Sequence, residues 1–141
     1  MRHYVDTAVV VAALTVEPGT SRAQAWIAAQ TSDDLLISDW VIAEFSSALS
    51  IKLRTGQIDV QLRAAALAAL SRFRLNRFAV LPVTSGNFRT AAIFADRHDL
   101  GLKASDALHL AIASEHGATL CSFDRRLIAA GPALAIPTVT P

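Results

Sequence analysis

The sequence predicts an α/β fold with three layers, α/β/α, in which helices cover both faces of a short parallel sheet. Its strand-like segments are short and continuously apolar, which is typical of parallel strands buried on both faces. Helical segments separate these strands along the chain. Of the 141 residues, 52% are hydrophobic and 18% are charged, so we expect one domain over residues 1–141 with a well-buried core.

The expected elements alternate in a regular order, and no repeat, low-complexity tract or long linker divides them. Four strands are expected at 3–6, 35–38, 78–83 and 118–123, and a fifth at 133–139. Helices are expected at 7–14, 20–30, 39–54, 58–72, 85–97, 104–116 and 124–131. Because helices separate the strands, we expect a parallel sheet of four or five strands.

Turn and capping residues set the boundaries in the first half of the chain. Pro18 and Gly19 form a turn, after which Thr20 or Ser21 is expected to cap the second helix. Ser38 ends the second strand and is expected to cap the long helix that follows.

Glycine and proline set the boundaries in the second half. Gly56 ends the long helix, and Pro82 marks the end of the third strand. Thr84 or Ser85 begins the next helix, and Gly117 stops the helix that leads into the fourth strand.

The composition excludes several classes of protein. No segment approaches the roughly 18 consecutive apolar residues of a membrane-spanning helix. The N-terminal apolar run directly follows Asp6 and lacks a convincing cleavage site, so we do not expect a signal peptide. Cys121 is the only cysteine, which rules out an internal disulfide and a cysteine-based zinc site. We therefore expect a cytoplasmic protein without a membrane anchor.

The net charge of +1 does not decide for or against nucleic acid, but the basic residues are nearly all arginine. Arg72, Arg74 and Arg77 lie close together and alternate with Phe73 and Phe78. Arginines next to aromatic residues suit contact with RNA or with a protein partner. The alternative is a solvated helix end whose phenylalanines face the core.

Four of the 12 acidic residues fall where a site is expected to form in a parallel sheet, beyond the carboxyl ends of the strands. Asp6 closes the first strand, and Glu44 lies in the helix after the second. Asp106 lies in the first turn of the helix that leads into the fourth strand, and Asp124 ends that strand. Taken singly, Asp6 and Asp124 could be helix N-caps, and Glu44 could be an ordinary boundary residue.

Asp106 has the least ordinary surroundings, because its helix is apolar on most sides. The helix dipole and free backbone N–H groups could stabilise its charge. Four carboxylates around one pocket would repel each other, and a divalent cation such as Mg²⁺ or Mn²⁺ would remove that conflict. We expect a solvated or core role for the four histidines. These are His3, His98, His109 and His116.

Such a carboxylate site suits phosphodiester hydrolysis. One or two metal ions can activate water and stabilise the leaving oxygen. Arginines around the rim would then help to bind the phosphate backbone. Arg125, which follows Asp124, is therefore a candidate for contact with RNA or a partner, as are Arg72, Arg74 and Arg77.

Four segments resemble the successive motifs of a known family. They are VDTAVVVAAL, WVIAEFSSAL, LKASDALHLAIA and CSFDRRL, which cover essentially the full chain in this order. They resemble the motifs of PIN domains, in particular the VapC-type toxins of bacterial type II toxin–antitoxin pairs. The most specific pair is SDALHLA followed by FDRRL.

The resemblance implies an endoribonuclease that depends on Mg²⁺ or Mn²⁺. The acids matching Asp6 and Asp106 are the usual direct metal ligands of the family. The acid matching Glu44 binds metal or orients the water, and the one matching Asp124 completes a second position or acts through water.

The resemblance also covers two hydroxyl groups and the partners. The hydroxyls matching Thr7 and Ser122 support the catalytic pocket, and no catalytic acid is missing. VapC toxins usually form homodimers and are inhibited by a small VapB-type antitoxin. We expect the antitoxin groove along helices 40–54 and 58–72, and a structured substrate such as transfer or ribosomal RNA.

Two other functions are consistent with parts of the sequence. A haloacid-dehalogenase-like phosphotransferase also has an aspartate after its first strand, but Ala8 stands where it needs an acid, and Lys103 is the only candidate for its lysine. A non-catalytic α/β interaction module would use the acids only as helix caps.

Overall fold

A five-stranded parallel sheet forms the centre of the computed structural model, which describes residues 1–141. The strand order is β3-β2-β1-β4-β5, and every neighbouring pair is parallel. The strands are β1 (His3–Val5), β2 (Leu35–Ser38), β3 (Ala79–Leu81), β4 (Thr119–Cys121) and β5 (Thr138–Val139). The expected parallel sheet is confirmed.

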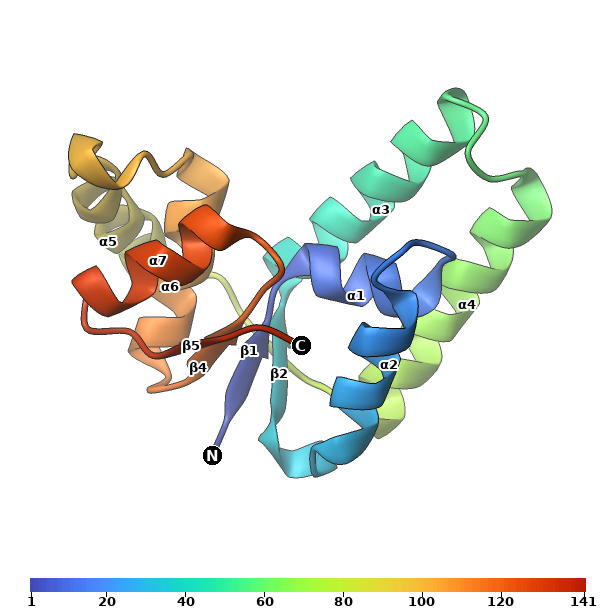
Figure 1. The fold of residues 1–141 in the computed structure, drawn as a ribbon, viewed down its shortest axis with the longest axis horizontal. Helices are drawn as coiled ribbons and strands as arrows, with labels where there is room; N and C mark the ends of the chain where they lie inside the picture. Colours follow the sequence, from blue (N-terminus) through green and yellow to red (C-terminus); the bar gives the residue numbers. More distant parts are fainter.

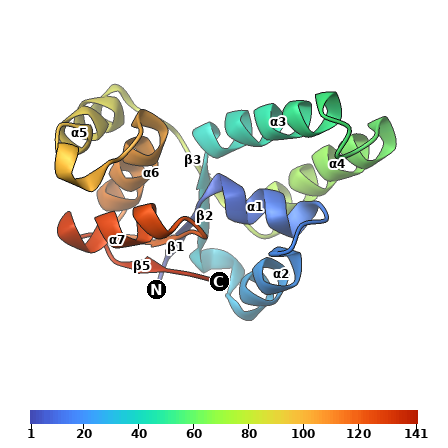
Figure 2. The same cartoon turned by 45° about the horizontal axis from the view of Figure 1, so that its top comes forward.

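Seven α-helices cover the two faces of this sheet, so the expected three-layer fold is also confirmed (Figures 1 and 2). On one face lie α1 (Thr7–Leu14), α2 (Thr20–Ala29), α3 (Asp39–Arg54) and α4 (Val60–Asn76). On the other lie α5 (Ser85–Ala95), α6 (Ala104–Glu115) and α7 (Arg125–Ala133). Two short 3₁₀ turns are η1 (Ser32–Asp34) and η2 (His98–Leu100). None of the helices is long and apolar enough to cross a membrane.

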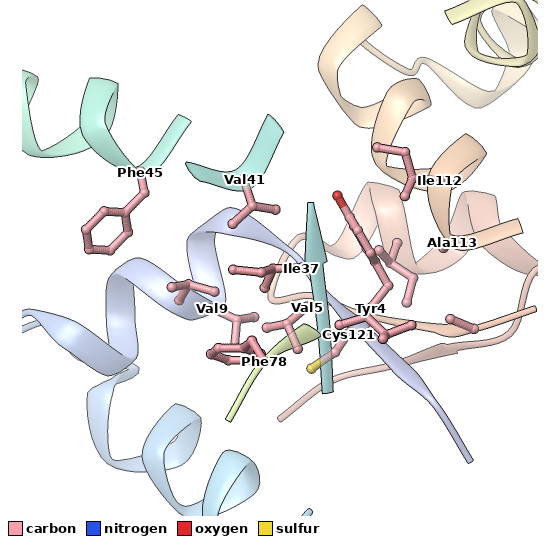
Figure 3. Packing of buried hydrophobic residues seen from close by; sticks show 14 of the residues in the cluster. Tyr4, Val5, Val9, Ile37, Val41, Phe45, Phe78, Ile112, Ala113 and Cys121 are labelled. Carbon is pink, nitrogen blue, oxygen red and sulfur yellow. The ribbon is translucent and has the colours of Figure 1, made fainter. Parts of the chain in front are cut away.

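The core lies where the helices meet the sheet. All residues of β2 and β4 are buried, as their continuously apolar sequences predict. Helices α1 and α3 contribute Val9, Val41 and Phe45, which pack near Val5 and Ile37 of the sheet (Figure 3). This packing fixes the strand ends relative to the helices that follow them.

The predicted N-cap residues are confirmed for two helices and wrong for a third. Ser38 accepts the N–H of Val41, and Thr84 forms a capping box with Asn87. The prediction of a hydroxyl cap on α2 is wrong, because Gly19 occupies the N-cap position. Thr20 instead donates its hydroxyl to the carbonyl of Ala12 and so ties α2 to α1.

Several element boundaries differ from the prediction, and the two largest differences are at the end of α4 and the start of β5. Helix α4 continues to Asn76 because no glycine or proline interrupts the sequence after Arg72. The fifth strand keeps only Thr138–Val139 of its predicted residues. The chain turns at Ala135, which has a φ of 59°, and Pro137 cannot donate a ladder hydrogen bond.

The strand order places a switch point beside β1. The chain runs from β1 outward through β2 to β3, and then returns to the other side of β1 with β4. In open parallel sheets, sites form beyond the carboxyl ends of the strands at such a reversal. The loops after β1 and β4 carry Asp6 and Asp124 to this point.

Candidate active site

A cavity of about 570 Å³ lies at the carboxyl ends of β1 and β4, between α1, α3 and α6. All four acids predicted from the sequence line this cavity, together with Thr7 and His109. The acids are Asp6, Glu44, Asp106 and Asp124. Residues that are up to 118 positions apart in the sequence thus line one cavity.

Asp6 is buried and points its carboxylate into the site. It occupies the N-cap position of α1, but its side chain makes no capping hydrogen bond. The hydroxyl of Ser122 donates to Oδ2 of Asp6 at 2.7 Å and accepts the backbone N–H of Asp124 at 3.0 Å. Ser122 therefore links the ends of β1 and β4 and fixes the orientation of Asp6.

Glu44 receives two hydrogen bonds on the same oxygen. The hydroxyl of Thr7 lies 2.7 Å from Oε1, and Nε2 of His109 lies 2.5 Å from it. Burial by itself would raise the pKa of Glu44, but the interactions with His109 and Thr7 outweigh it and lower the pKa. Glu44 is thus held as a carboxylate.

Asp106 is affected in the opposite direction. Burial raises the pKa of this carboxyl, and the charges of Asp124 and Asp6 raise it further, while the backbone of Lys103 opposes them. Asp124 has two roles, because its Oδ1 caps α7 by accepting the N–H groups of Arg126 and Leu127. Its capping role, one of the alternatives open from the sequence, therefore coexists with a place in the cavity wall.

The sequence of the chain matches one known protein family. A model of the PIN domain family matches residues 3–131. The chain belongs to the PIN domain family. No curated protein matches the sequence.

Solved structures share the fold of this PIN domain. A chain of the FitAcB structure from Neisseria gonorrhoeae is 19% identical with a TM-score of 0.74, over 96% of this chain and 95% of the matched chain. VapC20 from Mycobacterium tuberculosis, a sarcin-ricin loop cleaving toxin, is 24% identical with a TM-score of 0.74, over 92% of this chain and 95% of VapC20. VapBC2 from Rickettsia felis, bound to a promoter DNA fragment, is 17% identical with a TM-score of 0.67, over 99% of this chain and 98% of the matched chain.

His109 is part of the site, although the sequence did not single it out. Its side chain is 2% exposed. Besides contacting Glu44, its Nε2 lies 3.6 Å from Oδ1 of Asp6, and its Nδ1 lies 2.8 Å from the hydroxyl of Tyr4. One signal was available, because His109 follows Asp106 by three residues and so lies on nearly the same face of the helix.

One basic side chain, that of Lys52, lines the cavity of this PIN domain. Lys52 is the only lysine or arginine among the residues that line the cavity. Its Nζ is 2.6 Å from Oε1 of Glu17 and 3.4 Å from Oε1 of Gln57. Lys52 thus joins the end of α3 to the loop before α2.

The donors in the cavity fit a hard divalent cation, although no three acidic, histidine or cysteine side chains converge on one point. Carboxylate oxygens suit both Mg²⁺ and Mn²⁺. Mg²⁺ usually keeps several waters and takes only one or two protein carboxylates, so it does not require three converging ligands. The repulsion that raises the pKa of Asp106 is the conflict that a cation would relieve.

The arginine cluster lies away from this cavity. Helix α4 leads into the N-terminal end of β3, so Arg72 and Arg74 lie near the opposite edge of the sheet. Arg77 donates to the carbonyls of Ile27 and Gln30 at the end of α2, at 2.7 and 3.1 Å. The structure therefore agrees with the alternative of a helix end whose phenylalanines pack on the core, since Phe73 and Phe78 both do so.

Arg125 lies on the same side of the molecule as the acids, in a neighbouring cavity of about 740 Å³. Arg22 also lines this second cavity, and its guanidinium lies 5.4 Å from the centre of the Phe123 ring. Glu17 borders both cavities. Of the four arginines predicted to contact RNA or a partner, Arg125 is thus the one placed beside the carboxylates.

Proposed function

We propose that this PIN domain is an endoribonuclease dependent on Mg²⁺ or Mn²⁺ that acts as the toxin of a toxin–antitoxin pair. The main support is that four carboxylates line one cavity at the switch point of the sheet. Membership of the PIN family supports nuclease chemistry. The unit proposed to act is the single domain of residues 1–141.

Each group in the cavity has a proposed role. Asp6 and Asp106 would bind the cation directly, Glu44 would bind it or orient water, and Asp124 would complete a second position or act through water. A bound divalent cation supplies activation of water and stabilisation of charge on the phosphate. Ser122 holds Asp6 in position, and Thr7 holds Glu44 in the same way.

The proposed substrate is a structured RNA of the transfer or ribosomal class. VapC20, which shares this fold, is a sarcin-ricin loop cleaving toxin. The acids of the cavity would repel RNA on their own, so binding requires cations at the rim. Lys52, which lines this cavity, and Arg125, which lines the neighbouring one, are proposed to supply them.

The proposed partners are a VapB-type antitoxin and a second copy of the chain, in the cytoplasm. VapBC2 of the same fold was solved as a complex bound to promoter DNA. Exposed apolar side chains on α3 and α4 offer a surface for the antitoxin. They include Ile51 at 45%, Val60 at 65% and Leu62 at 52% exposure.

Expression of the toxin without its antitoxin tests the proposal. We expect growth arrest in a bacterial host and new RNA ends within minutes of induction. Asp106→Asn should abolish both effects, whereas Asp96→Asn, an exposed aspartate on α5's C-terminal side, should leave them unchanged. Undiminished toxicity of Asp106→Asn would favour the non-catalytic interaction module.

A further inference from the structure

We propose that Tyr4 and His109 form a buried relay that positions the carboxylate of Glu44 in the cavity. This inference rests on the proposed nuclease function, because it assigns Glu44 a task at that site. Neither Tyr4 nor His109 is an acid of the site, and neither belongs to the residues singled out from the sequence. Both are positioning residues, since they act through Glu44.

A continuous chain of hydrogen bonds carries the inference. The hydroxyl of Tyr4 lies 2.7 Å from Oγ of Ser38 and 2.8 Å from Nδ1 of His109. On the other side of the ring, Nε2 of His109 lies 2.5 Å from Oε1 of Glu44. Figure 3 shows the hydroxyl of Tyr4 pointing from β1 toward the space between α3 and α6. The chain therefore connects β1, β2, α6 and α3.

Counting donors and acceptors places a proton on Nε2 of His109. Glu44 is a carboxylate and only accepts, so Nε2 of His109 must carry the proton that it shares with Oε1. Ser38 accepts the N–H of Val41 and can donate its own proton to Tyr4. With the proton on Nε2, Tyr4 can donate to Nδ1, and every polar atom in the chain then has a partner.

The other tautomer breaks this pattern. A proton on Nδ1 alone would leave Nε2 and the Glu44 carboxylate as two acceptors in contact. The geometry thus excludes the form of the ring that carries its only proton on Nδ1.

The relay leaves one oxygen of Glu44 for the cavity. Thr7 and His109 both contact Oε1, and Oε2 has no hydrogen bond to the protein. Two donors from different helices fix the plane of the carboxylate. A carboxylate with one oxygen restrained and the other free is suited to bind a cation or a water in a defined direction.

Burial alone does not account for these residues. Tyr4, Ser38 and His109 are 0%, 0% and 2% exposed. Apolar side chains of similar volume could fill this space without any need for polar partners. Ser38 is also the N-cap of α3, so the same network sets the start of the helix that carries Glu44.

Calorimetric titration of the full chain with MnCl₂ tests the relay. His109→Asn removes the donor to Glu44, whereas His109→Gln places an amide N–H near the position of Nε2. We expect His109→Asn to weaken Mn²⁺ binding about 10- to 100-fold, and His109→Gln to restore most of the affinity. Tyr4→Phe, which deletes one oxygen, should weaken Mn²⁺ binding several-fold.

A double variant separates positioning from general packing. If His109 acts through Glu44, then Glu44→Gln with His109→Asn should bind Mn²⁺ no more weakly than Glu44→Gln alone. Additive losses, or wild-type affinity of His109→Asn, would overturn the relay. Thermal unfolding shows whether His109→Asn folds. If it does not, Tyr4→Phe replaces it in the same comparison with Glu44→Gln.

Two outcomes distinguish failure of the relay from failure of the proposed function. A wild-type chain that binds no Mn²⁺ and cleaves no RNA contradicts the nuclease function. Nitrogen-15 spectra of the metal-free protein test the relay alone, because they identify the protonated ring nitrogen. We expect a proton on Nε2 of His109, and an Nε2 without a proton would overturn the relay.

Discussion

Ser122 donates its hydroxyl to Oδ2 of Asp6 at 2.7 Å, across a separation of 116 residues. The two side chains come from the ends of neighbouring parallel strands, β1 and β4. Ser122 is fully buried, so water does not compete for this hydrogen bond. The orientation of the acid at the start of the chain therefore depends on a residue near its end.

Replacing Ser122 tests this dependence. Ser122→Ala leaves Asp6 without its buried donor, and we expect a loss of about 10- to 100-fold in Mn²⁺ affinity. Ser122→Thr keeps the hydroxyl and should retain most of the affinity. Calorimetric titration compares the two variants, and equal losses in both would show that packing, not the hydrogen bond, is what matters.

The raised pKa of Asp106 predicts how stability depends on pH. Because the folded protein holds the proton of Asp106 more tightly than the unfolded chain does, this group favours folding at low pH. Its contribution to the free energy of unfolding falls as the pH rises from about 4, the ordinary aspartate pKa, through the raised pKa of the folded protein. In EDTA at pH 7, Asp106→Asn should therefore unfold at a higher temperature than the wild type.

Thermal unfolding between pH 3.5 and 7 checks the sign of this effect. The advantage of Asp106→Asn should disappear below about pH 4, where the wild-type carboxyl is protonated as well. Added Mn²⁺ should stabilise the wild type more than the variant. Asp96→Asn is the matched control, and an equal gain in that variant would contradict the role of burial and charge at Asp106.

The sequence predicted the four acids because of where the strands end. In a parallel sheet, the residues after the strands lie at the same edge, so the sequence alone predicts that Asp6 and Asp124 lie close together. The position of Asp106 followed from its apolar helix.

Tyr4 and His109 could not be predicted in this way. Tyr4 reads as an ordinary strand residue, and His109 as one of four scattered histidines. The hydrogen bond between them depends on how α6 packs on β1, and no local sequence pattern indicates this tertiary contact. The place of the arginine cluster could not be predicted for a related reason, because composition does not reveal which edge of the sheet a helix end will reach.

The contacts of Arg77 predict a structural role. Since its guanidinium binds two carbonyls at the end of α2, Arg77→Ala should reduce the free energy of unfolding by about 1–2 kcal/mol. Arg72→Ala and Arg74→Ala, which remove exposed side chains, should change it by less than about 0.5 kcal/mol. Urea unfolding measures all three, and equal effects would contradict this assignment.

A tight contact at Gly131 predicts a stability effect far from the cavity. An added Cβ would lie 2.8 Å from the carbonyl oxygen of Ile136 and would also clash with Thr138. Gly131→Ala should therefore cost about 1–3 kcal/mol. Gly86→Ala is the control, because its Cβ would meet nothing closer than 3.5 Å, and helix propensity makes it neutral or stabilising. Urea unfolding that ranks them in the reverse order would contradict the packing of α7 on β5.

RNA cleavage by the purified chain tests the central claim most directly. The account predicts defined RNA fragments with Mn²⁺ or Mg²⁺, none with EDTA, and at least a 100-fold slower reaction for Asp106→Asn than for Asp96→Asn, because the four-carboxylate cavity is proposed to hold the cation. Cleavage that persists in EDTA, or that Asp106→Asn leaves at the wild-type rate, would contradict it.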